Sequence, residues 1–372
     1  LLLVLVMLAT QGYGQGRQFT FKHLTNQDGL SDASINDILQ DHKGFMWFAT
    51  VEGLNRYDGY EFRVYKKIPG DTTSLSDNWV ESIYEDNDSN LWVCTGNGLN
   101  LYMREQDNFL RIAPEPDNKN SLSDSYIRQV FEEGEGYWIN TMGGGVNYYN
   151  KKTKKYTHYR HDETDPHSIS FDWVWNVFKD SDDRLWFGTM GRGLNLFHRE
   201  TETFTRYPFF SDNPQINRIR CMYELGKNDF LVGTDAGLLR FFPDREDYFE
   251  IYQHDPQDET SISAGHVKTI FKDRSGHLWV AAQAGLDIYD PERDVFSHVR
   301  HNENDNLSLS ANEVWSIAQD DQDLIWIGTF KGGINILNIR QTHFKNWRHN
   351  SLDKKSLAEN SVLAFEERPD ST

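Results

Sequence analysis

The sequence repeats one short pattern at a nearly constant interval along most of its length. In each copy a central residue, usually tryptophan, is flanked by apolar residues and is followed six or seven positions later by a glycine and an apolar residue. Seven copies at a period of roughly 47 residues fall in the range of β-propeller blades. The central residues are Trp47, Trp92, Trp138, Trp186, Leu231, Trp279 and Trp326.

The first repeat divides into four short strands by alternation and turn residues. Residues 34–40 alternate and predict an innermost strand, residues 46–50 and 54–57 follow it, and residues 61–65 predict the outermost one. The turn after the first strand begins with aspartate and ends with glycine, which are residue types that favour tight turns. We therefore predict an all-β chain, a seven-bladed β-propeller of four-stranded antiparallel blades.

The order of these features predicts three segments. Residues 1–16 begin with an apolar run too short to cross a bilayer and continue with small and polar residues, as in the remnant of a secretory signal. The propeller is expected over residues 17–348. A further opening step and inner-strand pattern predict that residues 349–372 start a following repeat, in a second, truncated propeller.

Two segments compete to complete the seventh blade. Residues 19–24 precede the first repeat and resemble an outer strand, whereas residues 344–347 follow the seventh repeat. A strand from the start of the chain would pin the ring shut and leave no free sheet edge. We therefore favour closure by residues 19–24.

Composition limits the partners of the chain. The formal net charge is −19, and phosphate binding needs clustered lysine and arginine, so we expect no nucleic-acid binding through this region. Cys94 and Cys221 stand in different repeats and are expected to be free thiols that serve as small apolar residues. No cofactor is expected.

A pattern Asp-x-x-Gly-x-x-Trp recurs before several central tryptophans, as at residues 41–47 and 273–279. Such acidic turns could suggest calcium, but they lack the alternating ligands and the closing glutamate of a calcium loop. We interpret the aspartates as turn-stabilising and expect no metal site. The regular spacing of the tryptophans predicts that they pack between blades, outside any binding site.

Several motifs together resemble a known repeat family. They are the opening steps such as residues 74–76 (Ser-Leu-Ser), the Trp-x-Gly-Thr steps at residues 186–189 and 326–329, and the Gly-Leu-Asn steps that follow. The chain resembles, over about residues 17–367, the two-component regulator propeller repeats in the sensor region of hybrid two-component systems from Bacteroidetes. The fifth repeat departs from the pattern, because Leu231 replaces tryptophan and the opening is altered.

The resemblance implies a periplasmic sensor module. In that family the periplasmic part carries two seven-bladed propellers and an Ig-like domain, followed by a transmembrane helix, a histidine kinase, a receiver and a DNA-binding regulator. The receptor would be anchored in the inner membrane only through a segment downstream of this sequence. A glycan fragment bound outside the cell would then switch on polysaccharide-utilisation genes, and signalling would need a homodimer of the full receptor.

A ligand site is expected where the loops before the inner strands and the loops between second and third strands share one face. Aligned on the openings, the first variable position holds Ser34, Trp79, Tyr126, Trp173, Arg220, His266 and Glu313. The position two residues further holds Asn36, Glu81, Arg128, Trp175, Met222, Lys268 and Trp315. The second loops add Glu52, Asn97, residues 190–192, Asp235, Gln283 and residues 330–331.

Aromatic faces at such positions stack on sugars, and charged side chains bond to hydroxyls or carboxylates. We predict that an oligosaccharide is bound by Trp79, Tyr126, Arg128, Trp173, Arg192, Arg220, His266, Glu313 and Lys331. The basic members would favour an anionic or sulfated sugar. A competing interpretation is that Trp79, Trp173 and Trp315 pack between blades.

Three classes of function stay open. The favoured one is a sensor module that binds without chemistry. The second is a polysaccharide lyase or glycosidase, for which Glu52, Glu81, Asp235 and Glu313 are candidate carboxylates and His266 near Arg220 is a candidate lyase pair. The third is a protein-binding scaffold.

Overall fold

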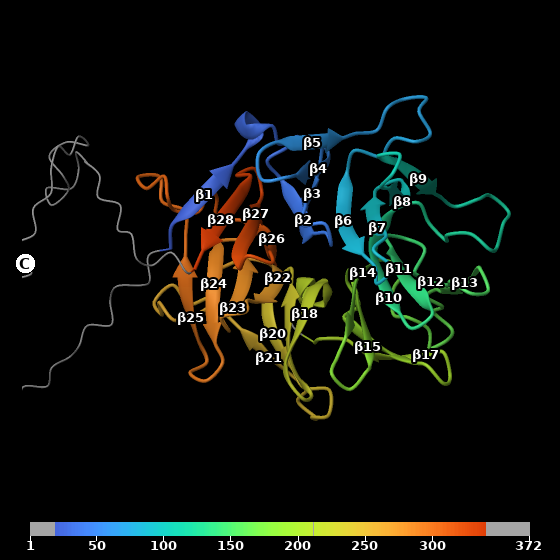
Figure 1. Cartoon of the computed structure of the whole chain (residues 1–372). Coiled ribbons are helices and arrows are strands. Elements are labelled where there is room, and N and C mark those ends of the chain that lie inside the picture. Colours follow the sequence, from blue (N-terminus) through green and yellow to red (C-terminus); the bar gives the residue numbers. More distant parts are fainter. Residues whose placement is uncertain (1–18, 211, 340–372) are drawn as a thin grey trace, which may run out of the picture.

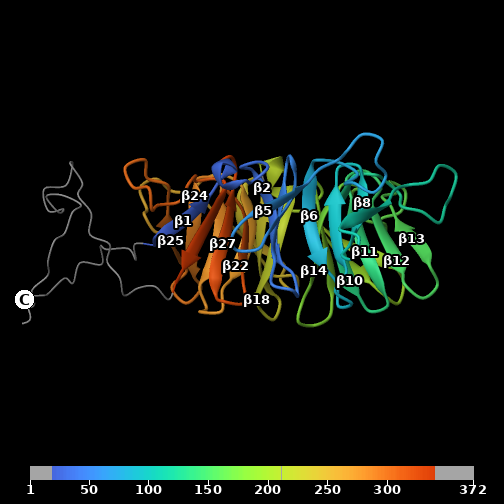
Figure 2. The same ribbon diagram turned by 45° about the horizontal axis from the view of Figure 1, so that its top comes forward.

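Seven four-stranded antiparallel sheets stand around a central axis (Figure 1). The structure is a computed structural model that describes residues 19–210 and 212–339. Each sheet runs from an inner strand at the axis to an outer strand at the rim, and Figure 2 shows neighbouring sheets side by side in a flattened ring. This confirms the predicted seven-bladed propeller.

The blades are numbered one to seven along the chain. Their strands, from the axis outwards, are as follows: β2 Ile35–Gln40, β3 Met46–Thr50, β4 Gly53–Tyr57 and β5 Phe62–Tyr65; β6 Val80–Glu85, β7 Leu91–Thr95, β8 Gly98–Met103 and β9 Asn108–Ile112; β10 Ile127–Glu133, β11 Gly136–Thr141, β12 Val146–Asn150 and β13 Lys155–Tyr159; β14 Val174–Lys179, β15 Leu185–Thr189, β16 Leu194–His198 and β17 Thr203–Tyr207; β18 Ile219–Gly226, β19 Asp229–Thr234, β20 Gly237–Phe241 and β21 Phe249–Tyr252; β22 Val267–Lys272, β23 Leu278–Ala282, β24 Gly285–Asp290 and β25 Val295–Val299; β26 Val314–Gln319, β27 Leu324–Thr329, β28 Ile334–Asn338 and β1 Phe21–Leu24. The strands of blade one begin and end within one residue of the predicted ones.

The seventh blade takes its outer strand from the start of the chain. Strand β1 pairs antiparallel with β28, with Phe21 opposite Leu337 and Leu24 opposite Ile334. The predicted closure by the N-terminal strand is therefore confirmed. The alternative closing segment, residues 344–347, and the predicted segments 1–16 and 349–372 lie outside the described residues.

The hydrophobic core lies between adjacent blades. Trp47 of blade one packs in one cluster with Tyr65 of its own blade and with Val93 and Tyr102 of blade two. All six repeated tryptophans are buried, with at most 9% of their surface exposed. The prediction that they pack between blades is confirmed, and it follows that the sheets hold one another in place rather than enclosing a single central core.

In five blades the aspartate of the acidic turn bonds to the tryptophan of the same blade. Asp41 accepts hydrogen bonds on Oδ1 from the backbone N–H groups of Lys43 and Phe45, each at 3.0 Å. Its Oδ2 accepts the indole N–H of Trp47 at 2.9 Å. The same indole bond recurs from Asp86, Asp180, Asp273 and Asp320. The interpretation of these aspartates as turn-stabilising is confirmed.

Blade five replaces both partners of this bond. Leu225 precedes Leu231 by the same interval as Asp180 precedes Trp186, and both leucines belong to one apolar cluster. A buried carboxylate without the indole donor would carry a desolvation cost. In blade five the carboxylate and the indole are both replaced by leucine, so no polar group of this pair is left without a partner. The blade therefore keeps its four strands, with an apolar contact in place of the hydrogen bond.

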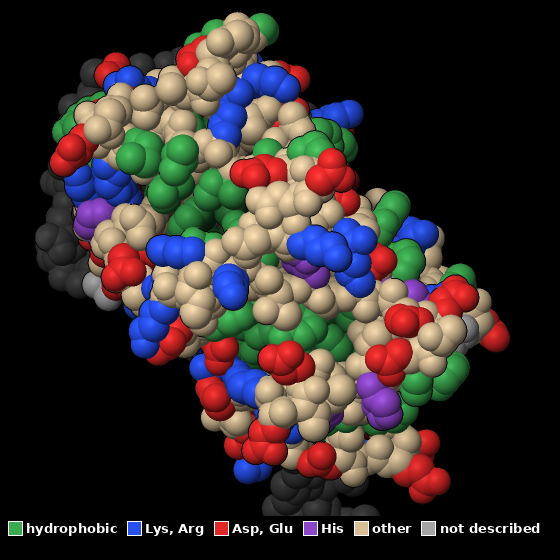
Figure 3. Space-filling model, turned by 90° about the vertical axis from the view of Figure 1, so that its right-hand side faces the viewer, with side chains coloured by type: hydrophobic (Ala, Val, Ile, Leu, Met, Phe, Trp, Pro, Cys, Tyr) green, Lys and Arg blue, Asp and Glu red, His purple; other side chains and the backbone are tan. Residues whose placement is uncertain are grey.

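Three further properties of the described residues are their surface charge, their cysteines and their helices. On the side shown in Figure 3, acidic and basic side chains are interspersed and apolar side chains reach the surface between them. Cys94 and Cys221 are free thiols, as predicted, with Cys94 buried and Cys221 partly buried. Within residues 19–210 and 212–339, no helix has the length and apolar character needed to cross a bilayer.

Candidate functional site

Every inner strand carries a β-bulge near its first residue. In blade one, Ile35 pairs with Thr50 and Asp37 pairs with Ala49, which leaves Asn36 as the extra residue. The same register shift occurs in the other six blades. A bulge frees one residue from the ladder and re-aims its side chain. Here that side chain is turned to the central channel.

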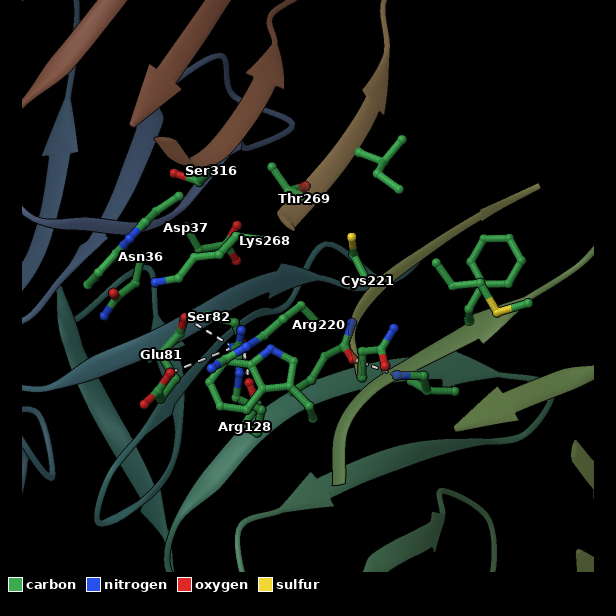
Figure 4. Close-up of a pocket in the computed structure, with 18 of the residues that line it drawn as sticks. Asn36, Asp37, Glu81, Ser82, Arg128, Arg220, Cys221, Lys268, Thr269 and Ser316 are labelled. Carbon is green, nitrogen blue, oxygen red and sulfur yellow. Dashed lines mark hydrogen bonds and ion pairs between the residues drawn. The ribbon is translucent and has the colours of Figure 1, made fainter. Parts of the chain in front are cut away.

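The seven bulge residues form one ring, which we call the inner tier. They line a channel cavity of about 280 Å³ (Figure 4), and are Asn36, Glu81, Arg128, Trp175, Arg220, Lys268 and Trp315. The residues that directly precede the inner strands form a second ring, the mouth tier, which consists of Ser34, Trp79, Tyr126, Trp173, Arg218, His266 and Glu313.

A repeated backbone bond holds the second loops against the mouth tier. In six blades the N–H of a residue between the second and third strands donates to the carbonyl of the mouth-tier residue of that blade, as from Gly96 to Trp79 at 3.2 Å and from Phe330 to Glu313 at 2.9 Å. The two sets of loops therefore share one face of the ring, as the sequence predicts.

The position of Arg220 differs from the one expected. It belongs to the inner tier, and Arg218 takes the mouth-tier position of blade five, because Ile219 pairs with Thr234 as Val174 pairs with Thr189. The short 3₁₀ helix η2 (Pro214–Asn217) replaces the usual opening and shortens it by two residues. Alignment on the opening therefore placed blade five two residues out of register.

Trp175 lies between two guanidinium groups. The Cζ atoms of Arg128 and Arg220 are 4.3 and 4.2 Å from the centre of its ring. Arg220 Nε also donates to Asp235 Oδ1 at 2.5 Å, and Arg128 Nη1 lies 3.8 Å from Glu81 Oε2. Stacking on an aromatic face fixes a guanidinium plane. Both arginines are therefore held in defined positions on the channel wall.

Lys268 is the third cation of the inner tier. Its Nζ lies 3.1 Å from the centre of the Trp315 ring. Burial, followed by the nearby charge of Arg220, lowers the pKa of Lys268 to about 7. In the same cavity burial raises the pKa of Asp37 to about 6, although Asp37 accepts a hydrogen bond from the N–H of Ile83 at 2.9 Å. Burial in the channel thus disfavours the charged form of both groups, the ammonium of Lys268 and the carboxylate of Asp37.

Glu81 joins the two tiers. Its Oε1 accepts hydrogen bonds from Trp79 Nε1 at 2.7 Å and from the hydroxyl of Tyr126 at 2.5 Å. Trp79 and Tyr126 belong to the mouth, whereas Arg128 of the inner tier lies near the second carboxylate oxygen, Oε2. A ligand that moves either aromatic ring would therefore also act on the inner tier.

The tryptophans of the mouth are not packed between blades. Trp79 is 44% exposed and Trp173 is 49% exposed, which contradicts the competing interpretation for these two residues. Trp315 is partly buried, lines the channel cavity and stacks on Phe330 with ring centres 4.6 Å apart. The mouth therefore presents large aromatic surfaces to solvent.

The opposite side of the mouth is formed by blades six and seven. Burial, and then Lys268, lower the pKa of His266. His266 Nε2 lies 3.5 Å from Glu313 Oε1, and Glu313 Oε1 also accepts the indole N–H of Trp315 at 2.8 Å. Arg192 and Lys331 stand in exposed second loops on the same face, apart from the inner tier.

The structure thus brings together most of the predicted residues in two adjacent rings. Trp79, Tyr126, Trp173, His266 and Glu313 are in the mouth tier, and Arg128 and Arg220 are in the inner tier. Lys268, Trp175 and Asp37 were absent from the predicted set. The alignment contained the first two at the bulge position, but no feature of the sequence shows which bulge residues meet.

The four carboxylates considered for hydrolysis each contact their own neighbours. Glu52 is exposed beside Lys66, with 3.7 Å between the charged atoms. Glu81 accepts from Trp79 and Tyr126, Asp235 from Arg220, and Glu313 from Trp315. This arrangement suits the holding of aromatic and cationic side chains.

Comparison with known proteins agrees with this geometry. The family described as "Two component regulator propeller" matches residues 29–52, 74–97, 168–191 and 308–331, which are the opening parts of blades one, two, four and seven. The chain carries two-component regulator propeller repeats. The resemblance stated from its sequence motifs is confirmed.

Two solved structures and one curated protein extend the comparison. The extracellular domain of a putative hybrid two component system from B. thetaiotaomicron is 26% identical with a TM-score of 0.77, over 92% of this chain and 44% of that chain. A second extracellular domain from the same organism, of a putative one component system, is 20% identical with a TM-score of 0.69, over 86% of this chain and 40% of that chain. Histidine kinase P4 of Formosa agariphila is 44% identical over 68 residues, which are 18% of this chain and 5% of that protein.

These relatives are much longer than the present chain. It spans less than half of the two solved extracellular domains and a small part of the kinase. The two solved domains match this chain over most of its propeller.

Proposed function

We propose that this regulator propeller is a periplasmic ligand-sensing module of a hybrid two-component receptor, and that it binds an oligosaccharide at the mouth of its channel. The observation that carries the proposal is the pair of half-exposed tryptophans, Trp79 and Trp173, above the inner tier, which combines charged side chains with two further tryptophans. Aromatic faces bind the C–H surfaces of sugars, and nearby polar groups bond to their hydroxyls.

Two further observations support a sensor. The matched solved domains are named as extracellular parts of putative two-component or one-component systems. In addition, Glu81 connects the mouth to the channel through hydrogen bonds, so a ligand contact has a route to the inner strands. In the full receptor, a dimer would pass the signal across the membrane if ligand favours one of two arrangements, and polysaccharide-utilisation genes would be the output.

The proposal is tested by calorimetry with a panel of oligosaccharides. Trp79→Ala and Trp173→Ala should each weaken saccharide binding about ten-fold, which corresponds to about 1.4 kcal/mol. Tyr60→Ala is the matched control, because Tyr60 is an aromatic residue exposed to 94% in the turn between β4 and β5, at the other end of the blade.

Incubation with the polymers separates binding from chemistry. We expect no shortened or unsaturated products after long incubation with a polysaccharide whose fragments bind. Release of products would support the lyase or glycosidase alternative. Absence of saccharide binding, or equal binding by the two tryptophan variants, would contradict the proposal.

A further inference from the structure

Lys268 is the one inner-tier cation without a carboxylate partner among the described residues. Arg220 pairs with Asp235 at 2.5 Å, and Arg128 lies 3.8 Å from Glu81. The ammonium group of Lys268 instead faces the Trp315 ring at 3.1 Å. Figure 4 shows Lys268, Arg128 and Arg220 on the wall of the same cavity, with Asn36 and Asp37 near Lys268.

A second unpaired donor lies on the same wall. Arg128 Nε is buried and has no hydrogen-bond partner within the part of the chain that the structure describes. Buried donors usually have a partner, and an unpaired one is costly. Because Trp175 fixes the Arg128 plane from one face, this group cannot turn freely to find another acceptor.

The charges around Lys268 favour one additional negative group. Arg220 on β18 and Arg128 on β10 oppose the ammonium charge, whereas Glu81 on β6 and Glu313 before β26 support it. Burial is the largest influence, and it lowers the pKa of Lys268 to about 7. The acidic lining formed by Glu81 and Asp37 would at the same time repel a doubly charged group such as a phosphate monoester.

We infer that the inner tier binds the acidic group of a sugar, a singly charged carboxylate or sulfate ester, which pairs with Lys268 and accepts a hydrogen bond from Arg128. This inference rests on the proposed function, because a sugar ring stacked at the mouth on Trp79 or Trp173 would direct the acidic group inwards. Binding restores the charge of Lys268, so a proton is taken up when the solution is near or above neutral pH.

The test compares matched ligands by calorimetry. Trigalacturonate, its carboxyl-reduced neutral form and a sulfated galactose oligosaccharide are measured at pH 6 and pH 8.5. We expect the acidic ligands to bind at least ten-fold tighter than the neutral one at pH 6, and this preference to shrink at pH 8.5. Preference for the uronate or for the sulfated sugar distinguishes the two acidic groups. Paired buffers of different ionisation enthalpy should show proton uptake at neutral pH.

Three variants separate charge from structure. Lys268→Met should lower the affinity for the acidic ligands about ten-fold and leave that for the neutral trimer within two-fold. Lys268→Arg should keep the acidic preference and remove its dependence on pH. Lys272→Met is the control, because Lys272 is the exposed last residue of the same strand, β22.

The outcomes distinguish this inference from the proposed function. If neutral and acidic trimers bind equally, or if Lys268→Met affects both equally, the inference is wrong and the sensor proposal stands. If no saccharide binds, the sensor proposal is wrong. A second measurement then decides the inference, namely whether free galacturonate protects Lys268 from acetylation by acetic anhydride at pH 8; without protection the inference is wrong as well. With protection, the acidic-group site is supported and the oligosaccharide function is not.

Discussion

Phe21 pairs with Leu337, so the first described strand of the chain and the last one belong to the same sheet. Phe21 is buried in a cluster with Trp279 of blade six and Leu337 of blade seven, and its N–H donates to the carbonyl of Leu307 at 2.8 Å. The ring is therefore held closed by hydrogen bonds and by apolar contacts at a single blade.

This closure predicts a large effect of one substitution at the start of the chain. Phe21→Ala removes a buried aromatic ring and should lower the free energy of unfolding by roughly 3–5 kcal/mol. Lys22→Ala is the control, since Lys22 is the exposed neighbour in the same strand. Urea unfolding followed by tryptophan fluorescence measures both. Equal stability of the two variants would show that β1 does not close the ring in solution.

The indole–carboxylate bond predicts a coupled effect within one blade. Blade five carries Leu225 and Leu231 where blade four carries Asp180 and Trp186. Asp180→Leu and Trp186→Leu should each be destabilising, because each leaves the remaining polar partner without its hydrogen bond. The double variant removes both partners, so its loss of stability should be smaller than the sum of the two single losses by about 1–3 kcal/mol. A double-mutant cycle in urea measures this difference. Strict additivity would contradict the pairing.

Lys268 predicts a stability that depends on pH in a defined direction. Its pKa in the folded protein is about 7 and its ordinary value is 10.5, so the unfolded chain binds more protons between these values. The contribution of Lys268 to the free energy of unfolding should therefore rise with pH over this window, by up to about 1.4 kcal/mol per unit. The measurement is the difference between the native protein and Lys268→Met at pH 6.5, 8 and 9.5. If the difference in unfolding free energy falls or stays constant as the pH rises, the prediction is wrong.

Asp37 predicts the opposite slope at lower pH. Burial raises its pKa from 3.8 to about 6, so the folded protein binds the proton more tightly than the unfolded chain. The stabilising contribution of this protonation is complete below about pH 4 and is lost as the pH rises through 6. The difference in unfolding free energy between the native protein and Asp37→Asn should fall over that interval. The measurement is urea unfolding of both proteins at pH 4, 5 and 7. A difference in unfolding free energy that stays constant over these values would contradict the raised pKa of Asp37.

Much of the architecture follows from the sequence because each blade repeats the same local rules. The strands of blade one, the inter-blade position of Trp47 and the N-terminal closure were all predictable from period, alternation and edge strands. The prediction failed at Arg220, because the helix η2 shortens one opening by two residues, and the altered residues of that opening do not reveal the change in length. Register in blade five is fixed by pairing of Ile219 with Thr234, which is a tertiary property.

The site was predictable as a face but not as a set of contacts. Alternation and loop position bring Trp79 and Tyr126 to the mouth. Trp79 bonds to Glu81 within blade two, whereas the bond from Tyr126 of blade three to Glu81 depends on neighbouring blades meeting. The environment of Lys268 likewise combines residues from four other blades. Such convergence depends on the curvature of the ring, which no local pattern in the chain encodes.

The bulge at the start of each inner strand separates recognition from folding. Since residues such as Asn36, Trp175 and Lys268 stand outside the strand ladders, their identity is not dictated by cross-strand pairing. Selection or engineering can therefore vary seven neighbouring positions while leaving the scaffold intact, so that under the proposed function a single ring could be retuned from one ligand to another.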